Sequence, residues 1–118
     1  MIAVIFEAMP EPGEMESYLD HAAALRPALE KIDGFLSVER FESMTRPGKL
    51  LSLSIFRDEA AVSAWRRMAE HRQAQSAGRS GLFRNYRLRV AWVMRDYGLE
   101  DRAGAPDDSR AFHGDSPF

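Results

Sequence analysis

Aromatic, imidazole and amide side chains that could bind a small organic molecule are concentrated between residues 58 and 95. Trp65 and His71 fall on a predicted amphipathic helix, and Gln75 shares a helix face with His71 because it follows four residues later. A neutral imidazole can accept a proton from a phenolic or enolic substrate near neutral pH. We therefore predict His71 as a catalytic base, with Trp65 and Gln75 lining the substrate site. The alternative is that Trp65 is a core residue and His71 a half-exposed structural residue.

Arginine residues accompany this helix and the strand that follows it. Arg72 is next to His71, and Arg89 lies on the closing strand. Because a guanidinium group can hold a carboxylate or enolate oxygen, both are predicted to steady an anionic substrate. The alternative is a solvated basic edge, with Trp92 in the core between two subunits. Substrate contacts are also predicted for residues of the sheet and its edge: Ser54, Phe83, Tyr86 and Trp92.

Composition and charge exclude several classes of protein. The 118 residues include no cysteine, which excludes a disulfide framework, a thiolate metal site and a cysteine nucleophile. The three histidines have no paired carboxylates at ligand spacing, so we expect no metal ion. A net charge of −2 and an N-terminal apolar run of five residues predict neither nucleic-acid binding nor a membrane span. We expect a cytoplasmic protein.

Hydrophobic periodicity predicts the order strand, helix, strand, strand, helix, strand. Pro27 predicts either a kink in the first helix or its division into two short helices. Gly34 is expected to end that helix, and Asp58 to cap the second one. Simple alternation puts Phe35 and Val38 on opposite faces of the second strand. Strands are predicted at residues 2–8, 35–43, 50–57 and 86–95, and helices at 14–32 and from 59 onwards.

This order is that of a ferredoxin-like α+β domain with a four-stranded antiparallel sheet, expected to span residues 1–98. Two helices can cover only one face of such a sheet, yet three of the strands are apolar on both faces. We therefore expect a second copy of the chain to cover the other face, which makes the protein a homodimer. Residues 99–118 are polar and are predicted to form a flexible tail.

Several short motifs resemble the antibiotic biosynthesis monooxygenase family of dimeric α+β barrels. They lie between residues 2 and 97 and comprise Leu25–Pro27, Ile32–Phe35, Glu39–Phe41, Trp65, His71–Arg72 and Tyr86–Val90. The resemblance implies a dimeric α+β barrel. Some members oxidise aromatic polyketides with O₂ and without metal or flavin, whereas others degrade haem or act on signal molecules. Gln75 stands about where haem-degrading members have their iron-binding histidine, and Phe6 and Glu7 stand where they use an asparagine.

Three functions follow as alternatives. The first is a cofactor-independent monooxygenase that oxidises a small aromatic or quinol-like substrate with O₂, with His71 as base and Arg72 or Arg89 steadying the anion. The second is a dimeric module that binds haem or another small ligand without oxidising it. The third is an accessory protein without catalysis, whose pocket is filled by side chains, so that no cavity lies between the second helix and the sheet.

Overall fold

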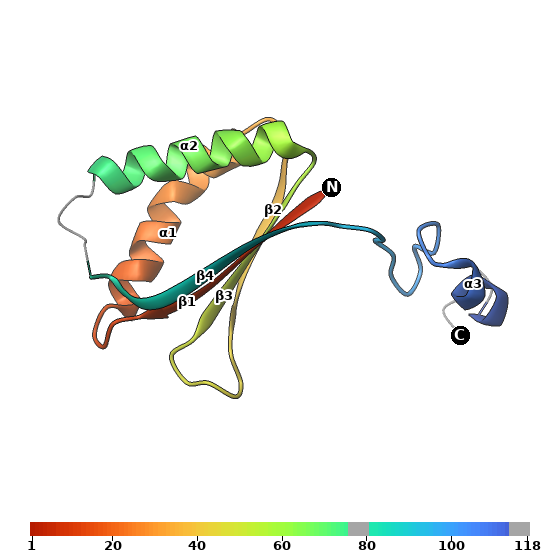
Figure 1. Cartoon of the computed structure of the whole chain (residues 1–118), viewed down its shortest axis with the longest axis horizontal. Helices are drawn as coiled ribbons and strands as arrows, with labels where there is room; N and C mark the ends of the chain where they lie inside the picture. The colour runs from red at the N-terminus through yellow and green to blue at the C-terminus, as the bar shows by residue number, and fades with distance from the viewer. Residues whose placement is uncertain (76–80, 114–118) are drawn as a thin grey trace.

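The computed structural model describes residues 1–75 and 81–113, and its side-chain description leaves out 70–75 and 113. Four strands and two long helices make up the body, and a short third helix lies in the C-terminal segment that extends away from it (Figure 1). In chain order the elements are β1 (Ile2–Pro10), α1 (Met15–Glu30), β2 (Phe35–Glu42), β3 (Leu50–Phe56), α2 (Glu59–Gln75), β4 (Phe83–Trp92) and α3 (Asp107–His113).

The four strands form one antiparallel sheet in the order β2-β3-β1-β4. This order and the βαββαβ succession confirm the predicted ferredoxin-like α+β fold. The predicted strand at residues 86–95 was displaced, since β4 begins and ends three residues earlier. The edge strands are therefore β2 and β4, and β1 is paired on both sides.

The two long helices cover the same face of the sheet, as Figure 1 shows. The core between the layers joins Ile2, Val4, Val38 and Phe56 of the strands to Leu29 of α1 and Val62 of α2. Phe56 is 0% exposed and is the largest fully buried side chain in the described residues. Burying a phenylalanine stabilises the fold by about 1.5–3 kcal/mol. This cluster lies near one end of the helix-covered face and fixes the helices against the sheet.

Pro27 does not divide the first helix in two, so that alternative of the prediction was wrong. Residues Met15–Glu30 form a single helix with Pro27 inside it. A proline removes one backbone donor, and the helix tolerates this loss because a buried stripe of Tyr18, Ala22 and Leu29 packs it against the sheet. The chain then leaves the helix through Lys31.

The prediction that Phe35 and Val38 face opposite sides was also wrong. The register between β2 and β3 shifts between Phe35 and Ser37, as expected for a β-bulge. The extra residue turns Phe35 to the helix side, where it packs against the core cluster that contains Val38. Its ring meets Phe56 at a centroid distance of 6.0 Å.

The sequence predicted a residue at the boundary of each long helix, Asp58 at the start of α2 and Gly34 at the end of α1, and only the first is confirmed. Asp58 caps α2, because its Oδ1 accepts a hydrogen bond of 2.9 Å from the backbone N–H of Ala61. That bond and the Arg57 guanidinium lower the pKa of Asp58 below its ordinary value of 3.8. Gly34 does not end α1 as predicted, because the helix ends at Glu30 with Lys31 as its C-cap; Gly34 has a φ of +93° in the turn that follows. Its carbonyl accepts a hydrogen bond of 2.7 Å from the N–H of Arg57.

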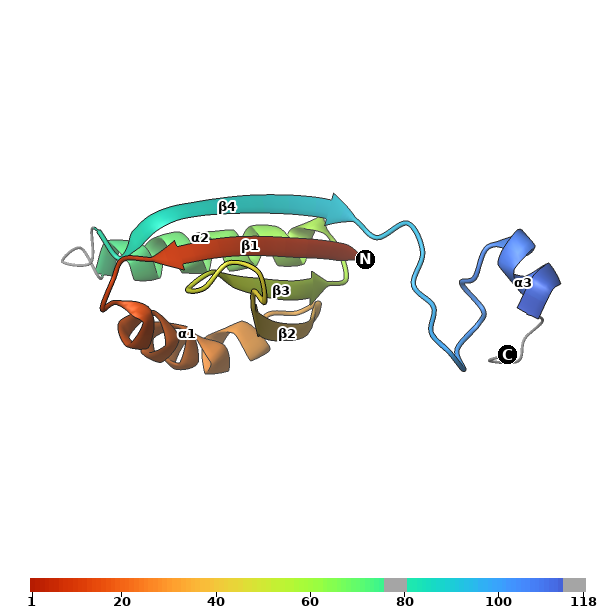
Figure 2. The ribbon, with the colours of Figure 1, turned by 90° about the horizontal axis from the view of Figure 1, so that it is seen from below.

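The chain leaves the body after β4 and includes a short helix that the sequence did not predict (Figure 2). Arg102 organises this segment: its guanidinium donates to Ser109 at 2.7 Å and lies 5.1 Å from the Tyr97 ring centroid. Ala105 is buried within it. The flexible tail expected for residues 99–118 stays a prediction, to which the structure adds this local order up to residue 113.

Candidate functional site

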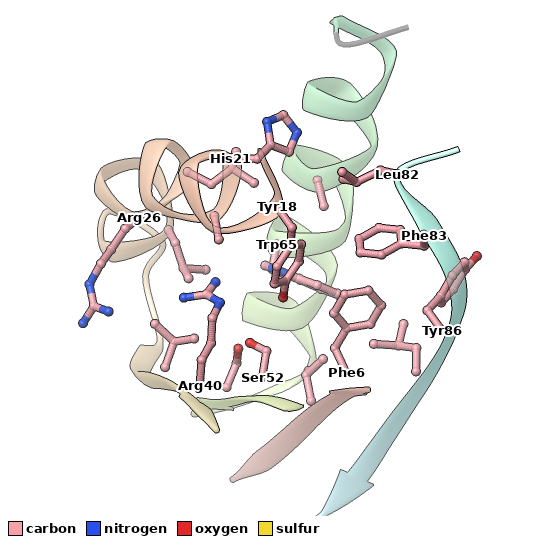
Figure 3. A pocket seen from close by; sticks show the side chains of 18 of the residues that line it. Phe6, Tyr18, His21, Arg26, Arg40, Ser52, Trp65, Leu82, Phe83 and Tyr86 are labelled. Carbon is pink, nitrogen blue, oxygen red and sulfur yellow. The ribbon is translucent and has the colours of Figure 1, made fainter. Parts of the chain in front are cut away.

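A cavity of about 810 Å³ lies between the two long helices and the sheet. Side chains of the sheet, of both helices and of the start of β4 point into it, and several of them are aromatic (Figure 3). Small-molecule sites have this size and are usually apolar with a few polar groups. The aromatic lining residues are Phe6, Tyr18, Trp65, Phe83 and Tyr86.

These aromatic rings contact one another in pairs. Phe6 meets Phe83 edge to face at a centroid distance of 5.6 Å, and Tyr18 meets Phe83 at 5.5 Å. Tyr86 completes the group at 5.7 Å from Phe6. Such pairs stabilise one another by about 0.5–1.5 kcal/mol beyond burial alone. The wall next to β4 is therefore held in shape by its own contacts.

The cavity floor follows the strand pairing across the sheet. Arg40 of β2 pairs with Ser52 of β3, Ser52 pairs with Phe6 of β1, and Phe6 pairs with Leu88 of β4. All four side chains line the cavity, because directly paired residues of neighbouring strands point to the same face. The floor consequently runs from a polar end at β2 to an apolar end at β4.

The charged groups of the cavity are all on basic side chains among the described lining residues. Arg40 is partly buried, and its Nε is a buried atom that has no hydrogen-bond partner in the described structure. Arg26, by contrast, donates to Glu30 at 2.9 Å near the surface. Arg84 and His21 also line the cavity, and no aspartate or glutamate does so among the described residues.

Four of the predicted substrate contacts line this cavity. They are Ser54, Trp65, Phe83 and Tyr86. Trp65 packs against Phe56 with a centroid distance of 6.3 Å, so it is part of the core and also a cavity wall. Ser54 is buried beside Ser52 because alternate residues of β3 face the helices. Their roles in binding or chemistry remain proposals.

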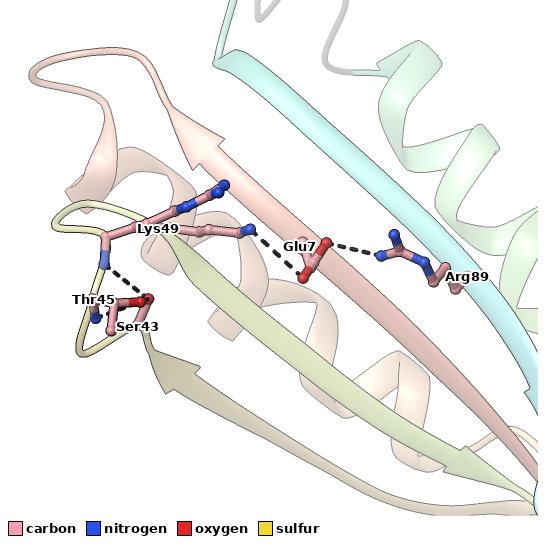
Figure 4. A network of polar contacts seen from close by, with 6 residues as sticks. Glu7, Ser43, Thr45, Lys49 and Arg89 are labelled. Atoms are coloured by element: carbon pink, nitrogen blue, oxygen red, sulfur yellow. Dashed lines mark hydrogen bonds and ion pairs between the residues drawn. The ribbon is translucent and has the colours of Figure 1, made fainter.

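Arg89 was wrongly grouped with these residues, because it lies on the opposite face of the sheet. It pairs with Ile5, one residue out of step with the cavity residues Val4 and Phe6. Its Nη1 donates to Glu7 at 2.9 Å, and Lys49 contacts the same carboxylate at 3.6 Å (Figure 4). These cations hold the pKa of Glu7 below its ordinary value of 4.5. Arg89 therefore cannot reach a ligand in the cavity.

Trp92 does not line the cavity either. It pairs with Ile2 at the far end of β1, whereas the β4 residues of the cavity pair with the stretch from Phe6 onwards. Its ring is 68% exposed on an edge strand. Its predicted role as a substrate contact is not supported by this position, and the alternative role between two subunits stays a prediction.

The predicted base and its neighbours lie in the last part of α2. His71, Arg72 and Gln75 are within this helix, but their side chains lie outside the described ones. The preceding residues Trp65, Met68 and Ala69 of the same helix line the cavity. The roles of His71, Arg72 and Gln75 consequently remain proposals.

The lining residues that were not predicted for the site include Tyr18, His21 and Arg40, whereas Ser52 was considered with Ser54 as a possible cavity residue. Tyr18 was identified only as part of the apolar stripe of the first helix, and His21 only as a surface or interhelix residue. Arg40 is two residues from the buried Val38 on the same strand and so faces the same side of the sheet, which is the signal that could have identified it. In the same way, alternation along β3 puts Ser52 on the face of Ser54 and Phe56.

The described residues contain neither a metal-binding cluster nor a membrane-spanning helix. No group of three or more histidine, aspartate or glutamate side chains could hold a metal ion there. Within the same residues, no helix combines the length and apolar character needed to cross a bilayer.

A family model described as antibiotic biosynthesis monooxygenase matches residues 1–77. The chain belongs to this family. A relative from Pyricularia oryzae, named "Jasmonate monooxygenase ABM", is 48% identical over 93 residues. The match covers 79% of this chain and 43% of the relative, so the chain spans less than half of that protein's length.

Solved structures confirm the fold assignment. Rv0793 from Mycobacterium tuberculosis superimposes with a TM-score of 0.69 at 21% identity, covering 82% of this chain and 98% of that one. PA3566 from Pseudomonas aeruginosa gives a TM-score of 0.64 at 20% identity, covering 78% and 92%. At these identities the likeness shows the fold alone.

Proposed function

We propose that the protein is a monooxygenase that oxidises a small organic molecule with O₂ inside the cavity between the helices and the sheet. The observation that carries this proposal is the cavity itself, about 810 Å³ in volume and walled by five aromatic rings. An accessory protein with a filled pocket would have no such space. Family membership and the name of the Pyricularia oryzae relative support the reaction class.

The proposed reaction uses electrons of the substrate itself and therefore requires no bound metal or flavin. A base removes a proton from a CH₂ group that is conjugated with a carbonyl, either directly or through an aromatic ring. The resulting enolate reduces O₂, and the peroxide formed on carbon takes up a proton to give a hydroperoxide. Loss of water converts this hydroperoxide to a carbonyl. One oxygen atom stays on carbon, and the other leaves with the two hydrogens as water. A substrate that fills the apolar end of the cavity would favour this route by displacing competing solvent.

We propose His71 as the base, with Arg72 near the developing anion. His21 provides the natural comparison, since it lines the cavity from the other helix. A correctly placed general base contributes about 100- to 10,000-fold to rate. Turnover by His71→Ala should fall by about 100-fold or more, whereas His21→Ala should keep most of it.

The test uses anthrone, whose CH₂ lies between two aromatic rings opposite a ketone, and jasmonate, the compound in the relative's name. Under ¹⁸O₂, mass spectrometry should detect a product with one labelled oxygen in place of two hydrogens. Absence of label from the products of both compounds would contradict the proposal. Equal turnover by His71→Ala and wild type would remove His71 from the mechanism.

We also propose that the working form is a homodimer. On the face that the helices leave free, β1 and β3 place Ile5, Leu51, Leu53 and Ile55 side by side. A continuous apolar strip of this kind is more stable when another surface covers it. A second copy of the same sheet is self-complementary under two-fold symmetry.

A further inference from the structure

We infer that Arg40 and Ser52 form a carboxylate-binding subsite at the β2 end of the cavity, so that the ligand is a small apolar molecule with one carboxylate. This inference rests on the proposed function, because it assigns a substrate class to the same cavity. It assigns a binding role to Arg40, which neither the family match nor the sequence pattern placed in the site.

The first argument is the state of the Arg40 side chain. Its guanidinium points from the sheet into the cavity (Figure 3). Its Nε is buried without a hydrogen-bond partner, and no ion pair joins this arginine to a carboxylate of the described residues. A buried cationic donor without an acceptor is costly, so such a group calls for an anion or ordered water. A carboxylate satisfies a guanidinium with two parallel hydrogen bonds.

The second argument is the charge of the whole lining. Arg26, Arg40 and Arg84 border the cavity, and none of its described lining residues is acidic. Arg26 is paired with Glu30 at 2.9 Å, as Arg57 is with Asp33 at 3.2 Å, whereas no ion pair of the described residues involves Arg40 or Arg84. These two guanidinium groups leave positive charge at the cavity, which favours an anionic ligand.

The third argument is the arrangement of polar and apolar groups. Ser52 is the direct cross-strand partner of Arg40, and Ser54 is buried two residues further along β3. Their hydroxyl groups can donate to the second oxygen of a carboxylate. Beyond them the floor becomes Phe6 and Leu88. A ligand with its charge at Arg40 would thus place its apolar body against the aromatic wall.

The experiment compares an acid with its neutral ester in the full-length protein. Binding of 1-naphthaleneacetate and of its methyl ester is measured by titration calorimetry for wild type, Arg40→Met and Arg66→Met. Arg66 is the matched control because it is an exposed arginine of α2 that does not line the cavity. Removing a charged hydrogen-bond partner weakens binding by about tenfold or more.

We expect wild type to bind the acid more tightly than the ester, and Arg40→Met to lose about tenfold of acid affinity while ester affinity stays within about twofold. Arg66→Met should behave as wild type. Arg40→Lys, which keeps the charge, should retain part of the preference for the acid. The inference would be overturned if wild type bound acid and ester with equal affinity. It would also be overturned if Arg40→Met lowered the affinity for both ligands by the same factor. Because binding is measured without turnover, an acid that binds but is never oxidised contradicts the proposed function alone.

Discussion

Two arginine residues on opposite faces of the sheet differ in their surroundings, and the difference decides what each can do. Arg89 is neutralised by Glu7 at 2.9 Å on the helix-free face. Arg40 faces the cavity and has a buried nitrogen without a protein acceptor. The sequence pattern pointed to Arg89, and not to Arg40, as a residue that could hold an anion. Strand register puts Arg89 on the helix-free face, where it forms a structural ion pair, and Arg40 on the helix-covered face, where it can contact a ligand.

The Glu7 carboxylate makes stability depend on pH. Its pKa is lowered mainly by the hydrogen bond from Arg89, and Lys49 adds to the effect. Because its pKa is lowered on folding, the Glu7 carboxylate stabilises the folded state at pH values above its ordinary pKa of 4.5. This stabilisation disappears as the pH falls through the folded-state pKa. Glu7→Gln should therefore unfold at a lower temperature than wild type at neutral pH, with the difference shrinking below about pH 4.

Thermal unfolding followed by circular dichroism between pH 3 and pH 7 checks this expectation. Glu30→Gln is the matched control, because Glu30 contacts Arg26 in an exposed pair with both side chains about half exposed. Such surface pairs contribute little. A difference for Glu7→Gln that grows on acidification would contradict the assigned sign.

At the residue scale, four of the nine residues predicted for the site line the cavity in the described part of the chain. Ser54 and Trp65 follow from alternation and from helical spacing, and both line the cavity. Arg40 was not predicted, because a charged residue on an edge strand is mostly exposed; only its alternation with the apolar Val38 indicates the helix-covered face. The faces of Arg40 and Arg89 depend on pairing register, which a single strand sequence does not specify.

At the scale of the elements, Gly34 lies in the turn between α1 and β2, and its carbonyl accepts a hydrogen bond from Arg57 just before α2 begins. Its φ of +93° suits glycine, and a Cβ at this position would lie 2.9 Å from the Cβ of Ala61. Gly34→Ala should therefore lower the free energy of unfolding by about 2 kcal/mol or more, through backbone strain and through this contact.

Gly48→Ala separates the two causes. Gly48 has a similar φ of +82°, but a Cβ there would meet no atom within 4 Å. This variant should lose only about 1 kcal/mol, the cost of a left-handed backbone for alanine. Denaturant unfolding of both variants gives the comparison. Equal losses would show that the contact with Ala61 is relieved by small movements.

The order and type of the elements were predictable, and two local details were not. The periodicities of two and of 3.6 residues identify every strand and both long helices. Pro27 suggested a break, but burial of Tyr18 and Leu29 on either side keeps the helix whole. The bulge at Phe35–Ser37 inserts one residue without any glycine or proline to mark it. Tertiary packing decides both cases.

The whole molecule is less compact than its length requires. Its radius of gyration is 17.3 Å, whereas a compact chain of this length has about 13–14 Å. The excess comes from the segment after β4, which extends from the body with Met94 and Leu99 exposed (Figures 1 and 2). Exposed apolar side chains on an extended arm are typical of a segment that packs against another chain.

The proposed homodimer can be tested at this scale. Light scattering coupled to size-exclusion chromatography should give twice the chain mass of 13.4 kDa at micromolar concentrations. Leu53→Arg, on the helix-free face, should shift the mass to that of one chain, because a buried unpaired charge opposes association. Met44→Arg is the control, since Met44 is fully exposed in the β2–β3 connection. A single-chain mass for wild type would contradict the dimer.

The width of the sheet sets the length of the cavity floor, which crosses the four strands through Arg40, Ser52, Phe6 and Leu88. Neighbouring strands lie about 4.8 Å apart, so three steps from β2 to β4 measure about 14 Å. A ligand whose carboxylate binds Arg40 and whose body lies across the strands has that length available before it reaches Tyr86 on the edge strand β4. Sheet geometry, rather than any single wall residue, would then limit how long a substrate this protein accepts.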